Sequence, residues 1–510
     1  MAKQRIVDET DFVIIGTGAG GATAARVLAA AGHGVVMLEE GPQLRAGARP
    51  LELLDAMAQS MRELATQTTR GGHPIPLLQG KCVGGSTAIN SGIIWRLPED
   101  VRTDWTDRFG LGELLDARGL EDTFATLEDE LGVHETDEEV RGGNNERMAR
   151  GAAALGLPGR VIHRNTKDCR GAGRCLQGCP NDARQSMDVS YVPRAIADGA
   201  RLHVRCRARK LLVESGRAVG VQGDVIGDDG RRTVGSFEVR ARLGVIVAAG
   251  ALHTPVLLQR AGLRGLVGER FQAHPGCAVV GEFDEPVGMS FGATQGYEVP
   301  MRERRFKIEA LALPPETLAA RLPGAGAEWQ ERLAKLDRYA QWCVQIRMEA
   351  MGTVRRGFGD APSVTYGPTA SDRERAREAI ILICRMMFAA GAREVYPGIA
   401  RRPEVIRSVG ELTALEGGEL RPSDFHMMAS HLFGTACAGS DPRRSVVGPD
   451  LQSHEVPGLY VMDASVFPTN LGVNPQHSIM ALVWRASERL ANAAHAPLRH
   501  SGTARGTLAG

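Results

Sequence analysis

The spacing of hydrophobic residues changes sharply within the first forty positions. Residues 12–15 are a short apolar run of β-forming side chains, residues 23–31 are rich in alanine, and residues 35–38 are a second apolar run. Glycines at G-x-G-x-x-G spacing separate the first run from the alanine-rich stretch, and Gly32 follows that stretch. The pattern predicts a strand, a tight turn, a helix that ends at Gly32, and a second strand.

Two later regions predict further strands. Residues 201–249 hold several short apolar–polar runs, with a turn signal at residues 228–230, and end in an apolar run before Gly250. We expect a β-meander there. Near the end of the chain, residues 459–462 predict a strand and residues 475–485 a helix.

Helical patterns dominate much of the remainder. Residues 43–90 predict a mixture of helix and loop, and residues 99–160 are charged and mainly helical. Within residues 290–425, the stretches 327–340 and 371–390 predict long charged helices.

Composition narrows the class of protein. The chain has 510 residues, so two or three domains are expected, and its 43% apolar and 24% charged residues are ordinary for a globular protein. A net charge of +1 gives no reason to expect nucleic acid or an anionic membrane as partner. No apolar run reaches the roughly 18 residues of a membrane span, and the N-terminal stretch lacks the apolar core of a signal peptide. We expect a cytoplasmic protein without an integral membrane segment, and a disordered tail over residues 497–510.

The first glycine turn points to a specific chemistry. Gly16 makes the tight turn, Gly18 lets the backbone approach a pyrophosphate, and Gly21 lets the helix pack on the strand. The helix N-terminus then presents unpaired N–H groups to the phosphates. Glu39 closes the second strand, where an acid accepts hydrogen bonds from ribose hydroxyls. The motif predicts a bound dinucleotide and does not distinguish FAD from NAD.

Three more segments are typical of ligand-binding loops. Residues 80–90 are dense in glycine, which permits close backbone approach to a flat or anionic ligand, or simply a tight turn. Residues 250–255 follow a predicted strand and start a helix with Thr-Pro. Asp463 ends a strand that leads through a polar loop to the helix at Pro475, and α/β folds bind ligands at such strand ends.

Three of the nine cysteines cluster. Cys169, Cys175 and Cys179 form a C-x5-C-x3-C-P pattern. A zinc site normally needs four ligands, and a four-cysteine iron–sulfur cluster has no fourth cysteine nearby. We favour a compact glycine-rich loop with partly buried thiols and no metal. An iron–sulfur or metal site is the alternative, and metal analysis of the purified protein distinguishes the two.

Five motifs together resemble the glucose–methanol–choline (GMC) oxidoreductase family, in the family's order and over nearly the whole chain. They are the N-terminal G-x-G-x-x-G with LEEGP (38–42), GKCVGGSTAIN (80–90), GALHTP…LLQRAG (250–262), HLFGTA (431–436) and VMDASVFPTNLGVNP (461–475). The cysteine loop with GCPNDARQSMDVSYVPRA resembles the branch that contains long-chain alcohol oxidases and bacterial cholesterol oxidases.

The resemblance implies FAD as the cofactor. The first glycine loop then binds the pyrophosphate and Glu39 the ribose, the second glycine loop lies against the isoalloxazine, and Asp463 lies near the ribityl–pyrophosphate segment. Some members attach the flavin covalently through a His just before the residue that matches Asn90, but Ile89 stands there, so non-covalent FAD is implied. The residues expected to bind the cofactor are Gly16, Gly18, Gly21, Glu39, Gly84, Gly85, Ser86, Asn90, Asp463, Asn474 and Pro475.

The family's active-site pair is a His followed later in the chain by His or Asn. His431 in HLFGTA matches the first and Asn474 in GVNP the second. A neutral His takes the alcohol proton, or hydrogen-bonds the alkoxide, as the α-hydride moves to flavin N5. An Asn amide fixes the hydroxyl without adding charge.

Four other histidines receive less specific roles. His477 follows Asn474 by three residues on the same helical face, so it is either a third polar group of the pocket or a packing residue, and packing is favoured. We expect His274, His426 and His454 to be structural or surface residues.

The resemblance implies an α/β fold with two domains. A Rossmann-like FAD-binding domain is discontinuous, over residues 1–100, 195–290 and 426–496, and a substrate-binding domain over residues 101–194 and 291–425 carries a sheet covered by helices. The implied activity is FAD-dependent oxidation of an alcohol to an aldehyde or ketone, with oxygen or another compound as electron acceptor. A non-redox flavin enzyme of the same fold, such as a hydroxynitrile lyase or photodecarboxylase, is the alternative. Apolar stretches in the substrate region favour an apolar or aromatic alcohol over a sugar.

Overall fold

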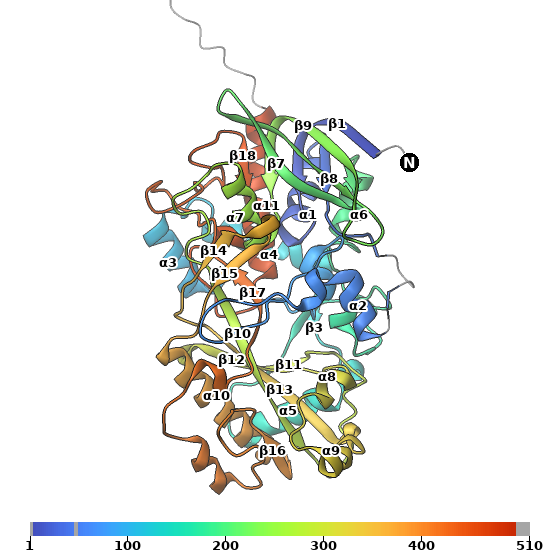
Figure 1. The fold of residues 1–510 in the computed structure, drawn as a ribbon, viewed down its shortest axis with the longest axis vertical. Helices are drawn as coiled ribbons and strands as arrows, with labels where there is room; N and C mark the ends of the chain where they lie inside the picture. Colours follow the sequence, from blue (N-terminus) through green and yellow to red (C-terminus); the bar gives the residue numbers. More distant parts are fainter. Residues whose placement is uncertain (1–3, 45–48, 51, 496–510) are drawn as a thin grey trace, which may run out of the picture.

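Two sheets divide the molecule along its long axis. The computed structural model describes residues 4–44, 49–50 and 52–495, so the predicted tail at 497–510 lies outside the described residues. The first sheet lies at the top of Figure 1 and the second at the bottom, and both are seven-stranded within the described residues. The α/β class with two sheet-based parts is therefore confirmed.

The first sheet combines a parallel part with a meander. Its strand order is β6-β2-β1-β9-β8-β7, with β18 paired to the end of β9. β6, β2, β1, β9 and β18 pair in parallel, whereas β9, β8 and β7 pair antiparallel. The meander predicted over residues 201–249 is thus present in β7 to β9, with β6 joining the parallel part. The bounds are β1 Gln4–Ile15, β2 Val35–Leu38, β6 Arg201–His203, β7 Cys206–Glu214, β8 Arg217–Ile226, β9 Thr233–Val247 and β18 Leu459–Val461.

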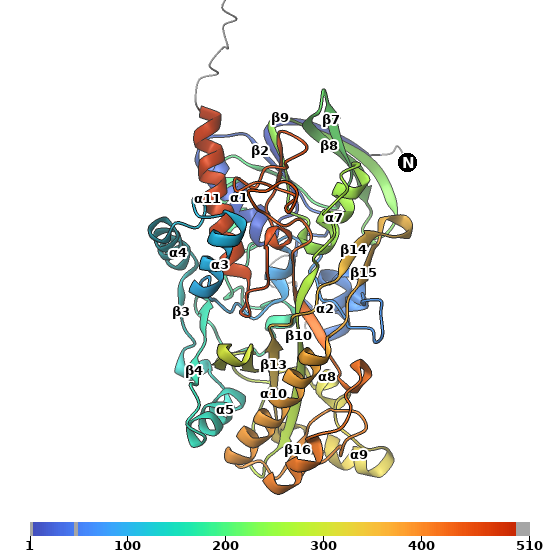
Figure 2. The same ribbon diagram turned by 90° about the vertical axis from the view of Figure 1, so that its left-hand side faces the viewer.

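Small residues let the first helix, α1 (Ala19–Ala30), pack closely between the sheet and its neighbours. Its glycines and alanines are buried almost throughout, and it contacts α6 and α11. Figure 2 shows α11 (Gln476–His495) beside α1. Trp105 and Leu127 of the helices that follow the second glycine loop join the same apolar core. The helices of this part are also α2 Leu53–Ser60, α3 Glu99–Phe109, α4 Ala117–Leu131, α6 Tyr191–Ala197 and α7 Gly250–Arg260.

The second sheet is antiparallel and carries its own core. Its order is β16-β10-β13-β12-β11-β4, and β17 pairs with β10. The long helix α10 packs across β10 and β13 and beside α5 (Figure 2). The strand bounds are β4 Arg160–Val161, β10 Gln272–Glu282, β11 Tyr297–Met301, β12 Phe306–Ala310, β13 Tyr339–Ile346, β16 Glu394–Tyr396 and β17 Met428–Phe433. The helices are α5 Gly143–Ala154, α8 Pro315–Ala319, α9 Gly326–Leu333 and α10 Ala370–Ala389.

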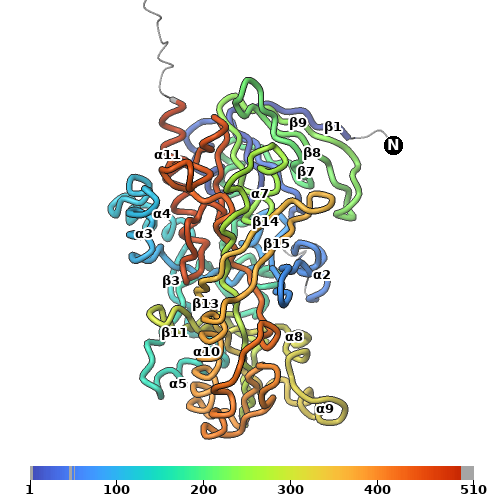
Figure 3. The backbone as a smooth tube through the Cα atoms, turned by 60° about the vertical axis from the view of Figure 1, so that its left-hand side comes forward, coloured from blue at the N-terminus to red at the C-terminus, as the bar shows by residue number. Residues whose placement is uncertain are grey.

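Two small antiparallel sheets of two strands each are also present among the described residues. They are β14 Thr353–Arg356 with β15 Pro362–Thr365, and β3 Val133–Glu135 with β5 His163–Asn165. Figure 3 shows the same overall division, with α3, α4 and α11 on one side of the first sheet and α5 and α10 in the second part. Across residues 4–44, 49–50 and 52–495, no helix is long and apolar enough to cross a membrane.

The sheets cut across the expected domain ranges. β10 and β17 lie inside ranges expected for the FAD-binding domain, yet they belong to the second sheet. Conversely, α4 and most of α3 lie inside a range expected for the substrate domain, yet their apolar faces belong to the first core. β10 and β17 therefore connect the two parts, which brings residues of both to one place.

One helix prediction is wrong over half its length. The charged stretch 327–340 forms a helix only as far as Leu333, and β13 begins at Tyr339. The aromatic and β-branched residues of β13 are buried in the second sheet, and this tertiary burial outweighs the charge pattern before it. The helix predicted over 371–390 is confirmed by α10.

Candidate active site and cofactor-binding loops

The first glycine loop leaves space at one of its four glycines. A Cβ on Gly16 would lie 2.3 Å from the Ala248 carbonyl oxygen, and one on Gly21 would lie 1.9 Å from the Gly16 oxygen. A Cβ on Gly18 would meet nothing within 4 Å among the described atoms. Gly18 precedes α1, which has neither a capping side chain nor an acid in its first turn among the described residues. The N–H groups that begin α1 therefore face an open space beside Gly18. A pyrophosphate fits in this space, and a side chain at Gly18 would fill it.

Glu39 joins this loop to the end of β2. Its buried carboxylate accepts hydrogen bonds from the Thr17 backbone N–H at 3.1 Å, the Thr17 hydroxyl at 2.7 Å and the Gly41 N–H at 2.9 Å. Burial raises its pKa in spite of these donors. The contacts fix the carboxylate at the strand end, where the ribose of a dinucleotide is expected.

The second glycine loop lies directly on the first. Gly84 donates its N–H to the Thr17 hydroxyl at 3.1 Å, and a Cβ on Gly85 would be 3.1 Å from the Gly18 Cα. Ser86 is exposed, and its hydroxyl accepts from the Gly80 N–H at 3.0 Å. The two loops thus form one continuous surface of backbone.

Asn90, at the end of this loop, reaches the C-terminal segment. Its side-chain N–H donates to the Gln476 side-chain oxygen at 2.6 Å, and its own oxygen accepts from the Gly92 N–H at 2.8 Å. Gln476 directly follows Pro475 at the start of α11, so Asn90, Asn474 and Pro475 come from segments held together here.

Asp463 braces the same region from the C-terminal side. Its buried carboxylate accepts from the Gly250 N–H at 2.8 Å, the Thr254 hydroxyl at 2.5 Å and the Ser465 N–H at 2.8 Å. Burial raises its pKa. The Cα of Asp463 also lies 3.3 Å from the Cβ position of Gly20, so this residue packs against the first turn of α1.

His431 lies on β17 and faces His274 of β10. Their Nδ1 atoms are 3.4 Å apart, with the rings perpendicular. Desolvation, together with the charge of Lys307, lowers the pKa of His431 to about 3, so its imidazole is neutral at ordinary pH. Burial likewise holds the pKa of His274 well below its usual value.

His274 connects His431 to the segment that carries Asn474. Its Nε2 accepts the N–H of Gly472 at 3.0 Å. Its Nδ1 lies 3.4 Å from the Nδ1 of His431 and 3.1 Å from the side-chain amide of Gln345. His274 thus connects the two candidate catalytic segments, and its expected structural role stays a prediction.

Asn474 contacts a lysine that the sequence analysis did not single out. Lys307 of β12 donates from its ammonium to the Asn474 side-chain oxygen, and Lys307 is the register partner of Gln345. Asn474, Lys307, Gln345, His274 and His431 therefore form a connected strip across the second sheet. The available signal was Lys307 and Glu309 two residues apart, hence on one face, in an otherwise apolar strand.

The other histidines lie off this strip. His477 is fully buried and stacks on Phe124 at 5.0 Å, with its Nε2 3.4 Å from Glu128. This supports packing as its role. His454 contacts Ser445 at 3.0 Å, and His426 is exposed.

The cysteine loop packs under the second glycine loop. The Arg164 guanidinium lies between two thiols, 3.9 Å from the Cys169 sulfur and 3.3 Å from the Cys175 sulfur. Arg184 donates to the Ala88 and Asn90 carbonyls. The three cysteines and both arginines surround a cavity of about 20 Å³. In the described part of the chain, no group of three His, Cys, Asp or Glu side chains is arranged to hold a metal ion.

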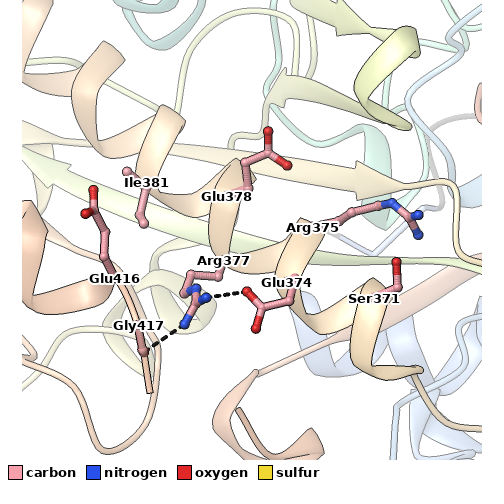
Figure 4. A pocket seen from close by; sticks show the side chains of 8 residues that line it. All are labelled: Ser371, Glu374, Arg375, Arg377, Glu378, Ile381, Glu416 and Gly417. Carbon is pink, nitrogen blue, oxygen red and sulfur yellow. Dashed lines mark hydrogen bonds and ion pairs between the residues drawn. The ribbon is translucent and has the colours of Figure 1, made fainter. Parts of the chain in front are cut away.

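A larger open pocket of about 370 Å³ lies elsewhere, on α10 (Figure 4). Its wall is mostly charged and includes the Arg377–Glu374 ion pair. Among the described residues, no candidate site residue lines it.

Comparison with known proteins decides the family. The GMC oxidoreductase model for the N-terminal part matches residues 10–276, and the model for the C-terminal part matches residues 351–482. This chain belongs to the GMC oxidoreductase family. Family membership assigns FAD as its cofactor and oxidation–reduction as its chemistry.

Several known proteins align with most of this GMC oxidoreductase chain. An uncharacterized GMC-type oxidoreductase of Mycobacterium tuberculosis is 35% identical, over 95% of this chain and 76% of the relative. One from Sinorhizobium fredii is 33% identical, over 94% of both chains. The long-chain-alcohol oxidase FAO1 of Arabidopsis thaliana is 28% identical, over 95% of this chain and 67% of the relative.

Solved structures confirm the GMC fold. A mutant of formate oxidase from Aspergillus oryzae matches with a TM-score of 0.72 at 16% identity, covering 97% of this chain and 99% of that chain. Pyridoxine 4-oxidase from Mesorbium loti matches with a TM-score of 0.69 at 19% identity, covering 95% and 99%.

Proposed function

We propose that this protein oxidises an alcohol to an aldehyde or ketone, with His431 and Asn474 at the reacting carbon and oxygen. The observation that carries the proposal is the strip that joins His431, through His274, to the segment of Asn474. A reaction that moves a hydride and a proton from one carbinol group is favoured by a general base and by a group that orients the hydroxyl, and these two side chains can supply both.

FAD supplies the electron acceptor of the chemical step: when bound, its N5 takes the α-hydride. His431 and Asn474 carry out the proton transfer and the orientation of the substrate. His431, neutral because of its low pKa, takes the hydroxyl proton or hydrogen-bonds the oxygen as it gains charge. Asn474 orients the hydroxyl oxygen of the alcohol so that the α-C–H bond points toward the second glycine loop. The alcohol thus loses a hydride and a proton, and a carbonyl remains.

We propose non-covalent FAD, because Ile89 offers no nucleophile at the position used for covalent attachment. Ile89 is buried within the second glycine loop, and its neighbour Asn90 is already bonded to Gln476. Denaturation should therefore release FAD into the supernatant. Flavin that stays with the precipitated chain would contradict this.

We propose an apolar or aromatic alcohol as the substrate, and oxygen or another compound as the final acceptor. The long-chain-alcohol oxidases among the relatives support an apolar alcohol. A cytoplasmic location stays a prediction from the sequence.

The test is anaerobic flavin reduction. Holoenzyme mixed with 1-dodecanol, benzyl alcohol or glucose should be bleached by the first two. His431→Ala should keep its flavin but lose about 10²–10⁴-fold in the reduction rate, which is the usual contribution of a general base. His426→Ala, an exposed histidine off the strip, is the matched control and should keep the wild-type rate.

Two results would overturn the proposal. Wild-type rates in His431→Ala would remove His431 from the chemistry. A wild-type flavin that no alcohol bleaches would favour the non-redox alternative, a lyase or photodecarboxylase on the same fold.

A further inference from the structure

Lys307 is a buried cation placed directly behind Asn474. The side chain is 0% exposed. Its ammonium donates to Glu298 Oε2 at 2.9 Å and to the side-chain oxygen of Asn474, and it forms an ion pair with Glu309 Oε1 at 2.6 Å. The position of Lys307 is therefore defined from three directions.

The two carboxylates stabilise the buried lysine, although they also repel each other. Glu298 and Glu309 are register partners on β11 and β12, and like charges opposite one another destabilise a sheet. Lys307 lies between them and neutralises the repulsion. Burial alone would raise the pKa of Glu298, but the charges of Lys307 and Arg160 outweigh it and lower that pKa. The carboxylates in turn raise the pKa of Lys307, so Glu298 and Lys307 both keep their charges.

Further donors complete the cluster. Glu298 also accepts from Arg160 at 2.8 Å and from the Trp95 indole N–H at 3.0 Å, and Glu309 accepts from Gln295 at 2.9 Å. An ion cluster desolvated to this degree contributes little net stability compared with apolar side chains. The Lys307 ammonium of this cluster also contacts Asn474. This contact indicates that the cluster acts on Asn474 rather than on the stability of the fold.

The contact decides which way the Asn474 amide is turned. A lysine ammonium donates and does not accept, so the atom of Asn474 that faces it is the oxygen. The Nδ2 group, with its two N–H bonds, is then the part of the amide left for other partners. Asn474 is buried, at 7% exposure, so rotation by half a turn would place N–H against the ammonium and leave both unsatisfied.

We propose that Lys307 is a positioning residue: it turns the Asn474 amide so that its N–H group donates to the substrate oxygen as that oxygen gains negative charge. The inference rests on the proposed function and deepens it, because it makes the site selective for a reacting oxygen that becomes anionic. Donors oriented in advance toward developing charge lower the barrier, since no reorganisation is needed during the step. Lys307 itself does not touch the substrate in this arrangement.

The first test uses Asn474→Asp in the holoenzyme. One carboxylate oxygen keeps the contact with Lys307, so the chain keeps its packing, but the second oxygen replaces the N–H group. We expect the anaerobic flavin reduction rate with benzyl alcohol to fall about 10²–10³-fold, the loss typical of one oxyanion donor. A wild-type rate in Asn474→Asp would overturn the inference.

The second test removes the cation itself. Lys307→Met with Glu309→Gln deletes one charge of each sign and leaves Glu298 paired with Arg160. We expect at least a tenfold loss in kcat with little change in KM, because the orientation matters most when charge develops. Lys307→Arg should recover part of the rate. Lys335→Met, which breaks a lysine–glutamate pair with Glu282 in the same sheet, is the matched control and should keep the wild-type rate.

A substrate series separates positioning from a merely structural role. Para-substituted benzyl alcohols differ in the acidity of the hydroxyl, so the wild-type reduction rate should depend on the substituent. In the double variant that dependence should become steeper, because the site no longer stabilises the anionic oxygen. Unchanged substituent dependence together with an unchanged rate would overturn the inference. Wild-type holoenzyme that no alcohol reduces would instead overturn the proposed function, so the two failures are distinguishable.

Discussion

Replacing Gly18 by Ala should weaken FAD binding without weakening the fold. Gly18 has φ −68° and ψ −169°, which alanine adopts freely, and a Cβ there meets nothing within 4 Å among the described atoms. Alanine also restricts the unfolded chain. The free energy of unfolding of the apoprotein should therefore stay the same or rise by about 0.4–1 kcal/mol.

The cost should fall on the cofactor. The new methyl group would stand where a pyrophosphate approaches the start of α1, so phosphate oxygens would lose hydrogen bonds from the backbone N–H groups there. A hydrogen bond to a charged group contributes about 1.5–3 kcal/mol. Losing one raises the Kd for FAD about 10- to 150-fold.

Two assays separate these effects. Titration of apoprotein with FAD, followed by flavin fluorescence, gives Kd, and urea unfolding of the apoprotein gives stability. Gly20→Ala is the contrasting variant, because its Cβ would lie 1.8 Å from the Met462 carbonyl oxygen, so it should lose stability first. Gly32→Ala, at φ +84° with nothing within 4 Å among described atoms, should cost about 1–2 kcal/mol of stability and leave Kd unchanged. An unchanged Kd in Gly18→Ala would refute the placement of the pyrophosphate.

Three further outcomes are expected. His477→Leu should lower the Tm yet keep the wild-type flavin reduction rate, because this ring packs on α4; a large loss in rate would return His477 to the pocket. Asp463→Asn should lower the Tm, at a cost of about 1–3 kcal/mol, because an amide N–H then faces a donor of the Asp463 site; an unchanged Tm would contradict the bracing role. The lowered pKa values of His274 and His431 mean that the native state binds fewer protons than the unfolded state. The free energy of unfolding should thus be highest above pH 6.5 and fall as pH drops from 6.5 toward 3, and equal urea midpoints at pH 7.5 and 5 with saturating FAD would contradict this.

The conformation of the proposed cofactor-binding loops was predictable because its determinants are local. The spacing of Gly16, Gly18 and Gly21, with an acid closing the next strand, specifies a turn, a helix start and a strand end within one βαβ unit. The structure adds that Thr17, between two of these glycines, joins Glu39 to the second glycine loop through its hydroxyl. A threonine at that position carries no signal by itself, because its two partners are set by tertiary packing.

The strip behind the proposed active-site pair was not predictable in the same way. Lys307 and Asn474 are separated by 167 residues, and His274 and His431 by 157, so no local period relates them. A charged residue in a short strand usually faces solvent, and burial of Lys307 becomes visible only once β11 and β13 flank β12. The wrong helix end before β13 has the same cause, because sheet burial outweighs a local charge pattern.

The segment just before α11 is held from both parts of the molecule at once. Gly472 donates to His274 of the second sheet, Asn474 accepts from Lys307 of the same sheet, and Gln476 accepts from Asn90 of the second glycine loop. Three alternate residues of one short segment thus each have a fixed partner. The segment therefore cannot shift relative to the second glycine loop or the second sheet without losing a buried hydrogen bond. The proposed function requires such restraint, because a carbinol must lie within reach of both a flavin and a base and an error of about 1 Å is costly. We therefore expect variants with a different substrate preference to differ in the side chains around the segment of Gly472, Asn474 and Gln476, rather than in that segment itself.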